Sequence, residues 1–140
     1  MKPVVLDASV VAAAFFPEKH SAAAQKLLVS GGDLCAPDLI YAELANVIWK
    51  RYRRREIDKS EAVELLADVL ELPLDTTPSE QLADAALDLA MRTGRTVYDC
   101  LYVVLAGQLK AVLVSGDRRL VNAFAHGPLK DCVRWLGGAP

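Results

Sequence analysis

The chain has few of the residues that hold catalytic zinc or build disulfide frameworks. Its 140 residues include two histidines and three cysteines, and neither set shows the spacing of a zinc site or a disulfide pattern. The cysteines are odd in number and lie far apart, at Cys35, Cys100 and Cys132. We interpret His20 and His126 as surface residues. The sequence thus gives no support to a zinc enzyme or a disulfide-rich secreted scaffold, and its cysteine usage is typical of a reducing cytoplasm.

Long apolar runs are also missing. No stretch approaches the roughly 18 uncharged apolar residues of a membrane span. The apolar segment that follows Lys2 is interrupted by Asp7, so we interpret it as a first strand and not as an export signal. We therefore predict a soluble, cytoplasmic protein with no membrane-spanning segment.

The chain has no strong excess of charge of either sign. The formal net charge is −2, hydrophobic residues make up 53% and charged residues 24%. This composition is typical of a globular chain and excludes extended disorder. A chain of this length buries a core without disulfides, so we predict one domain over residues 1–140. Any contact with a polyanion has to come from a local basic patch.

Short strand-like runs alternate with longer helical segments. The predicted strands cover residues 4–6, 34–36, 72–75, 112–114 and 133–135. The predicted helices cover residues 9–16, 18–29, 38–54, 60–71, 79–92, 98–110 and 117–125. The fourth helix begins at a cap, which is either Asp58 or Ser60. This alternation predicts an α/β fold with helices on both faces of a parallel sheet, and ligands of such folds bind at the carboxyl ends of the strands.

Four carboxylates stand where an unpaired charge is costly. Asp7 and Asp117 directly follow strand-like runs, so both are expected at the carboxyl edge of the sheet. Asp99 lies in the first turn of a helix that is otherwise apolar. Glu43 falls on the apolar stripe of the helix that follows the second strand. A buried carboxylate needs a partner, and one divalent cation serves all four at once.

Each acid has a simpler explanation when it is taken alone. Asp99 and Asp117 each fit a cap or turn at a helix N-terminus, where the helix dipole favours an anion. Glu43 fits a buried ion pair. Asp7 is the hardest to explain in this way, because it follows a central apolar strand. Taken together, the four favour a single site.

The ligand chemistry of this site indicates a hard cation. Closely packed carboxylates raise one another's pKa, and Mg²⁺ or Mn²⁺ relieves that repulsion because both prefer oxygen ligands. Carboxylate-held Mg²⁺ is typical of phosphodiester chemistry, in which the metal activates water and neutralises phosphate charge. We predict catalytic and metal-binding roles for Asp7, Glu43, Asp99 and Asp117.

These acids and their neighbours form four motifs in a fixed order. The motifs are Asp7-Ala8-Ser9, Glu43 with Asn46, Tyr98-Asp99, and Ser115-Gly116-Asp117-Arg118-Arg119-Leu120. Together they resemble the PIN-domain nucleases, and in particular the short toxins of VapBC toxin–antitoxin systems. The resemblance covers essentially the whole chain, from residue 1 to about residue 135.

The resemblance implies a parallel sheet of strand order 3-2-1-4-5 and a metal-dependent endoribonuclease. Asp7 and Asp99 match the central metal ligands of that family. Glu43 matches the acid that helps to position or activate water, and Asp117 matches the more variable fourth acid. The products implied by the resemblance carry a 5′-phosphate and a 3′-hydroxyl.

Three polar residues match positions behind the metal ligands of the family. They are Ser9, Asn46 and Ser115. Many members have threonine where this chain has Ser115, and the change keeps the hydroxyl. The implied partners are an RNA substrate, a cognate VapB-like antitoxin and a second copy of the chain in a homodimer.

A run of basic residues ends the helix over 38–54. It supplies five of the sixteen lysines and arginines: Lys50, Arg51, Arg53, Arg54 and Arg55. The helix dipole favours such residues at a solvated helix end, and contact with an RNA backbone is the functional alternative. Arg118 and Arg119 either contact the substrate phosphate or are simply exposed. The substrate-binding candidates are Arg51, Arg54, Arg118 and Arg119.

The two helices over 38–71 form a predicted hairpin arm with more apolar surface than one small sheet needs. Its apolar side chains are Trp49, Ile57, Leu65, Leu66, Val69 and Leu70. Ordinary core packing explains at least half of them. The family resemblance implies a groove for the C-terminal segment of an antitoxin, whose Arg or Lys would block the carboxylates.

Three other functions remain to be compared with a nuclease. An aspartyl-nucleophile phosphatase needs a second acid two residues after the first, where this chain has Ser9. A phosphorylatable receiver domain has clustered acids after strand one and a lysine after its last strand, and this chain has neither. A catalytically inactive PIN-like RNA-binding or assembly module is the remaining alternative, and the presence of all four acids argues against it.

Overall fold

The computed structural model describes residues 2–30 and 32–138, so both ends of the predicted 1–140 domain lie outside the described residues. Every predicted strand and helix is present. The strands are β1 (Val4–Leu6), β2 (Leu34–Pro37), β3 (Leu74–Thr77), β4 (Val112–Ser115) and β5 (Val133–Trp135). The helices are α1 (Ala8–Phe15), α2 (Ser21–Leu28), α3 (Leu39–Arg53), α4 (Lys59–Leu70), α5 (Ser79–Thr93), α6 (Val97–Leu109) and α7 (Arg118–Ala123).

The five strands form one parallel sheet in the order β3-β2-β1-β4-β5. This confirms the α/β class and the strand order that the family resemblance implies. The chain moves from β1 toward one edge of the sheet and later from β4 toward the other, so the switch point lies between β1 and β4. Leu6 pairs with Val114, and the next residues along the two strands, Asp7 and Ser115, are therefore neighbours at the carboxyl edge.

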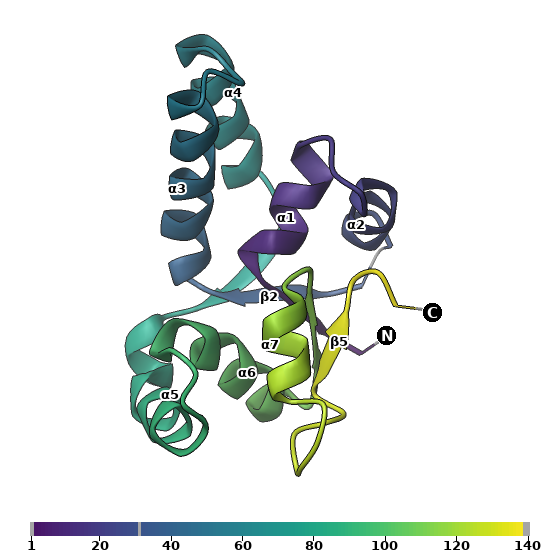
Figure 1. Cartoon of the computed structure of the whole chain (residues 1–140), viewed down its shortest axis with the longest axis vertical. Coiled ribbons are helices and arrows are strands. Elements are labelled where there is room, and N and C mark those ends of the chain that lie inside the picture. The colour runs from purple at the N-terminus through teal and green to yellow at the C-terminus, as the bar shows by residue number, and fades with distance from the viewer. Residues whose placement is uncertain (1, 31, 139–140) are drawn as a thin grey trace.

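Helices cover the sheet on both sides. α1 to α4 lie on one side and α5 and α6 on the other (Figure 1). α6 contacts β1, β2 and β4, which explains why its sequence is apolar almost throughout. The paired helices α3 and α4 extend beyond the sheet as the predicted arm (Figure 1).

Two local predictions differ from the structure in detail. β3 begins at Leu74 and not at residue 72, because Leu74 pairs with Leu34 of β2 and the preceding residues turn out of α4. Asp58 is the cap of α4, and Ser60 lies inside the helix. Asp58 accepts from the Glu61 N–H and the Glu61 side chain accepts from the Asp58 N–H, which forms a capping box.

The apolar residues of the arm divide into two groups. Ile57, Leu65 and Leu66 pack against a small core cluster around Phe16, and Val69 is buried in the main core, as ordinary core packing predicts. Trp49 and Leu70 are about half exposed, at 50% and 55%. A groove of about 430 Å³ runs between α3 and α4 and is lined by Ala45, Ile48, Trp49, Tyr52, Lys59, Ala62, Val63 and Leu66. Within the described residues, every helix is too short or too polar to cross a membrane.

Candidate active site

Asp7 is the buried centre of the predicted site. It follows β1 and caps α1, where its carboxylate accepts from the Val10 N–H at 3.3 Å. Its two oxygens also accept hydrogen bonds from the hydroxyls of Ser9 and Ser115. Burial raises the pKa of Asp7 to about 6, although these hydrogen bonds stabilise the charged form and oppose the shift.

The two serines tie the carboxyl end of β1 to that of β4. Ser9 Oγ accepts from the Gly116 N–H at 2.8 Å, and the fully buried Ser115 accepts from the Asp117 N–H at 3.0 Å. A side chain at Gly116 would place its Cβ 3.2 Å from Ser9 Oγ, so a glycine fits this close approach. These contacts put Ser9 and Ser115 beside Asp7, and their role in supporting metal ligands stays a prediction.

Glu43 projects from α3, one turn from the buried Ile40 and next to the buried Leu44. It is half-buried, and burial together with the charge of Asp99 raises its pKa. Its partner is Tyr102 of α6, whose hydroxyl donates to Glu43 Oε1. Among the described residues no ion pair involves Glu43, so the buried ion pair that we weighed as an alternative is not observed.

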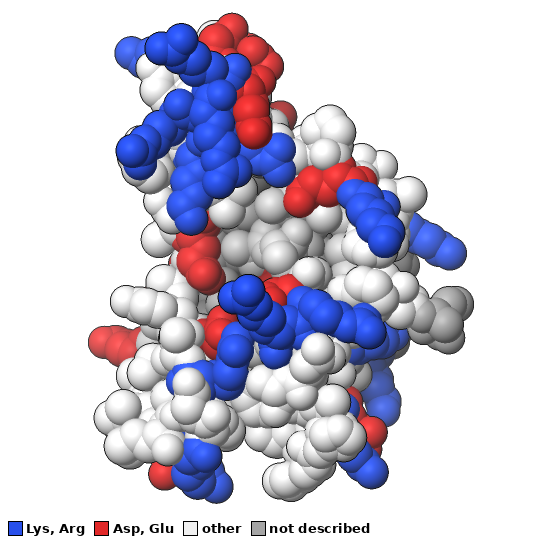
Figure 2. Space-filling view, viewed as in Figure 1, with Lys and Arg blue, Asp and Glu red and all other residues white. Residues whose placement is uncertain are grey.

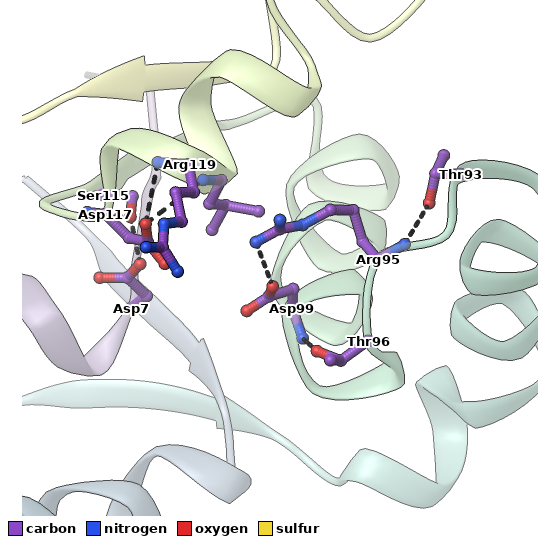
Figure 3. Close-up of polar contacts among 9 residues, drawn as sticks. Asp7, Thr93, Arg95, Thr96, Asp99, Ser115, Asp117 and Arg119 are labelled. Atoms are coloured by element: carbon purple, nitrogen blue, oxygen red, sulfur yellow. Dashed lines mark hydrogen bonds and ion pairs between the residues drawn. The ribbon is translucent and has the colours of Figure 1, made fainter.

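Asp99 lies in the first turn of α6, as predicted. Thr96 is the cap of that helix, and its hydroxyl accepts from the Asp99 N–H at 3.1 Å. The capping alternative for Asp99 is therefore wrong. The Asp99 carboxylate is free of the helix backbone and accepts from Arg95 Nη2 at 2.8 Å (Figure 3).

Three of the four predicted acids influence one another through space. The charge of Glu43 raises the pKa of Asp7, and the charge of Asp99 raises that of Glu43. Burial and all three carboxylates raise the pKa of Tyr102, which keeps its hydroxyl protonated as a donor. In the described ranges, however, no three His, Cys, Asp or Glu side chains are close enough to hold a metal ion. Asp99 turns instead to Arg95.

Asp117 has a different environment from the other acids. It caps α7, and its Oδ1 accepts from the N–H groups of Arg119 at 2.9 Å and Leu120 at 3.4 Å. The capping interpretation is thus correct for Asp117. Its backbone still joins the site, because its N–H donates to Ser115, which in turn donates to Asp7 (Figure 3).

The remaining candidates lie around this centre. Asn46 is exposed on α3, and no described hydrogen bond joins it to an acid. Arg51 contacts Glu18 at 3.8 Å and Glu56 at 3.1 Å, and it stacks on Phe16. These intramolecular contacts account for its position without RNA.

The other three predicted substrate arginines are exposed. Arg54 ends α3, Arg118 stacks on the Trp135 ring at 3.9 Å, and the Arg119 side chain extends toward the carboxylates (Figure 3). Figure 2 shows basic side chains on the arm and in a second band across the molecule, with acidic side chains between the two. A polyanion could therefore contact basic groups on both sides of the acids.

Sequence reasoning missed Tyr102 and Arg95. Tyr102 follows Asp99 by three residues, so helical periodicity places both on one side of α6. The Tyr102 hydroxyl lies within an otherwise apolar run, and this pattern predicts a buried polar partner for it. Arg95 precedes Asp99 by four residues, which is the spacing of an ion pair on a helix.

Comparisons with known proteins identify the family of the chain. The PIN domain family model matches residues 4–125. Ribonuclease VapC3 of Pyrobaculum aerophilum is 34% identical over 123 residues, which is 86% of this chain and 94% of that protein. Ribonuclease VapC12 of Mycobacterium tuberculosis is 29% identical over 123 residues, covering 88% of this chain and 93% of that protein.

Solved structures show the same fold. A Pyrobaculum aerophilum protein superposes with a TM-score of 0.68 at 27% identity, over 87% of this chain and 79% of that one. The Mycobacterium tuberculosis toxin VapC20, described as cleaving the sarcin-ricin loop, gives a TM-score of 0.66 at 16% identity, over 86% and 94% of the two chains. The matched family model and the 34% identical relative show that the chain belongs to the PIN-domain family, alongside the VapC ribonucleases.

Proposed function

We propose that this chain is an Mg²⁺- or Mn²⁺-dependent endoribonuclease, built as a single domain over residues 1–140, and the toxin of a toxin–antitoxin pair. The observation that carries the proposal is that Asp7, Glu43 and Asp99, which follow β1 or lie on α3 and α6, are within electrostatic reach of one another, where burial and, to a smaller extent, a neighbouring charge raise the pKa of the first two. Its relatives named ribonucleases support the choice of RNA. A cytoplasmic location is part of this proposal.

The carboxylate oxygens of these residues suit a hard divalent cation, and the acids would have to draw closer together to share one ion. Asp7 and Glu43 offer carboxylate oxygens, and neither takes part in any ion pair of the described residues. The buried Asp7 and the half-buried Glu43 both favour a cation that prefers oxygen ligands. Asp7, Glu43 and Asp99 would hold the ion, with Asp117 as the outer fourth acid. When bound, the ion supplies an activated water and neutralises charge on the scissile phosphate.

The protein groups around the acids set their orientation. The hydroxyls of Ser9 and Ser115 hold both oxygens of Asp7. Tyr102 holds Oε1 of Glu43, which leaves Oε2 to accept a proton from the attacking water.

RNA contacts would come from the exposed arginines on either side of the acids. Arg54, Arg118 and Arg119 are free of ion pairs among the described residues. Their charge offsets the repulsion between an RNA phosphate and the acidic centre. We leave Arg51 out of this set, because Glu18, Glu56 and Phe16 already hold it.

The antitoxin partner also belongs to this proposal. A solved VapBC2 complex from Rickettsia felis has the same fold, with a TM-score of 0.64 at 15% identity over 95% of this chain and 98% of that one. The half-exposed Trp49, Tyr52 and Val63 on the α3–α4 groove supply apolar surface for a partner helix. Homodimer formation remains a prediction, which light scattering of the purified chain tests directly.

The test is cleavage of a mixed pool of structured RNAs with Mg²⁺ or Mn²⁺, with EDTA as the metal-free control. Asp99→Asn removes a proposed ligand. Asp84→Asn makes the same change at an exposed position of α5 and serves as the matched control. Cleavage by the wild type and D84N, but not by D99N, is the expected result. Metal-independent RNA binding without cleavage by the folded wild type would favour the inactive RNA-binding module instead.

A further inference from the structure

Arg95 is the one cation paired with a predicted metal ligand in the described part of the chain. Its Nη2 lies 2.8 Å from Asp99 Oδ2, and the two side chains are 26% and 28% exposed. Figure 3 shows the Arg95 side chain extending from the α5–α6 connection to Asp99. A positive charge therefore already occupies a carboxylate that the proposed function assigns to the metal.

The backbone on both sides of this pair is held in place. Gly94 ends α5 with φ +76°, in the left-handed region that favours glycine. The Arg95 N–H donates to Thr93 Oγ1 at 3.3 Å, and the Asp99 N–H donates to Thr96 Oγ1 at 3.1 Å. Because the backbone is fixed, separating the pair needs movement of the Arg95 side chain only.

The Arg95 side chain is incompletely satisfied in its present position. Its Nε is buried and has no hydrogen-bond partner among the described residues. An unpaired buried donor is costly, so the ion pair with Asp99 has to compensate for it. A stronger partner for Asp99 would remove that compensation and release the side chain.

A second arginine–aspartate pair has the same spacing but is an ordinary surface contact. Arg92 and Asp88 are also four residues apart, but their side chains are 70% and 59% exposed. Salt and solvent screen such a pair strongly. The Arg95–Asp99 pair is partly shielded from solvent and lies within the electrostatic field of Glu43.

We infer that Arg95 is a tethered counter-ion that competes with the catalytic metal for Asp99. In the metal-free protein its guanidinium neutralises Asp99, and metal binding displaces it. Arg95 thereby sets the metal concentration at which the site fills. This inference rests on the proposed metal-dependent function. It makes Arg95 a positioning residue, because Arg95 acts through Asp99.

The experiment is a titration of metal-free full-length protein with Mn²⁺, with free Mn²⁺ measured by electron paramagnetic resonance. Arg95→Gln removes the charge, Arg95→Lys keeps the charge without the planar fork, and Arg92→Gln removes an equal charge from the exposed pair. We expect R95Q to bind Mn²⁺ roughly three- to tenfold more tightly than the wild type. R95K should fall between them, and R92Q should stay within about twofold of the wild type.

Thermal unfolding separates this role from a purely structural one. R95Q without metal should melt below the wild type, and Mn²⁺ should raise its melting temperature by more than it raises that of the wild type. A lower melting temperature with an unchanged Mn²⁺ affinity in both R95Q and R95K would overturn the inference and leave the proposed metal site intact. Failure of the wild type and R95Q alike to bind Mn²⁺ would overturn the metal site itself.

Discussion

β1 and β4 are each followed by an aspartate that caps the next helix, yet the two junctions differ in burial and in partners. Asp7 is 7% exposed and accepts from two hydroxyls and one N–H, and its pKa is raised to about 6. Asp117 is half-buried and accepts only backbone N–H groups of α7 among the described residues. The same strand–aspartate–helix motif thus gives one residue suited to chemistry and one suited mainly to helix capping.

RNA cleavage should show the largest difference between the two junctions. Asp7→Asn removes a charge at the buried centre and should lower kcat/KM on the order of 10³-fold. Asp117→Asn keeps the cap and should cost about tenfold or less, because its carboxylate already serves the helix. Steady-state cleavage of one RNA by both variants measures the contrast. Equal losses of kcat/KM would mean that Asp117 contributes as much to cleavage as Asp7.

The pH dependence of stability should next reveal the burial of Asp7. Because folding raises the pKa of Asp7 from 3.8 to about 6, the folded state binds more protons than the unfolded state between these values. The free energy of unfolding of the metal-free protein should therefore fall as pH rises from about 4 to about 6, by on the order of 3 kcal/mol.

Urea unfolding of the wild type and Asp7→Asn from pH 4 to 7, with EDTA, separates the contribution of Asp7 to the unfolding free energy from that of the other acids. The difference in unfolding free energy between the two proteins should change over that interval and level off above it. A wild-type curve parallel to that of Asp7→Asn would contradict the buried, proton-binding role of Asp7.

Ser115 joins the two junctions, so its removal should disturb both. Ser115→Ala deletes the hydrogen bond that most strongly opposes the raised pKa of Asp7, and it leaves the Asp117 N–H without its acceptor. We expect a loss of about 2 kcal/mol in unfolding free energy at pH 7. Ser115→Thr keeps the hydroxyl and is the matched control. The loss should be smaller at pH 5, where Asp7 is mostly protonated.

The smallest effect is expected from the cap of α7. Asp117→Ala should destabilise the protein by about 1 kcal/mol, while Asp117→Asn should change stability by a few tenths. Chemical denaturation at pH 7 measures both. If D117A also lost metal affinity, measured by Mn²⁺ titration, then Asp117 would hold the ion in addition to capping the helix.

The sequence by itself determined the class of fold and the position of each acid within its own element. The alternation of apolar runs gave the strands and helices, because a period of two or 3.6 residues follows from local backbone geometry. The ends of β1 and β4 were therefore predictable, and with them the locations of Asp7 and Asp117. The four-residue spacing of Arg95 and Asp99 is also a local feature of the chain, so this ion pair could be predicted from the sequence alone, and it was overlooked.

Only the tertiary structure decided which polar groups meet. Tyr102 donates to Glu43 across 59 residues of sequence, and Ser115 donates to Asp7 across 108. The second contact depends on the register of β1 against β4, and the first on the placement of α3 and α6, which both contact β2. Burial then separated Asp7 from Asp117, because the desolvation of a carboxylate depends on everything packed around it and not on its neighbours in the chain.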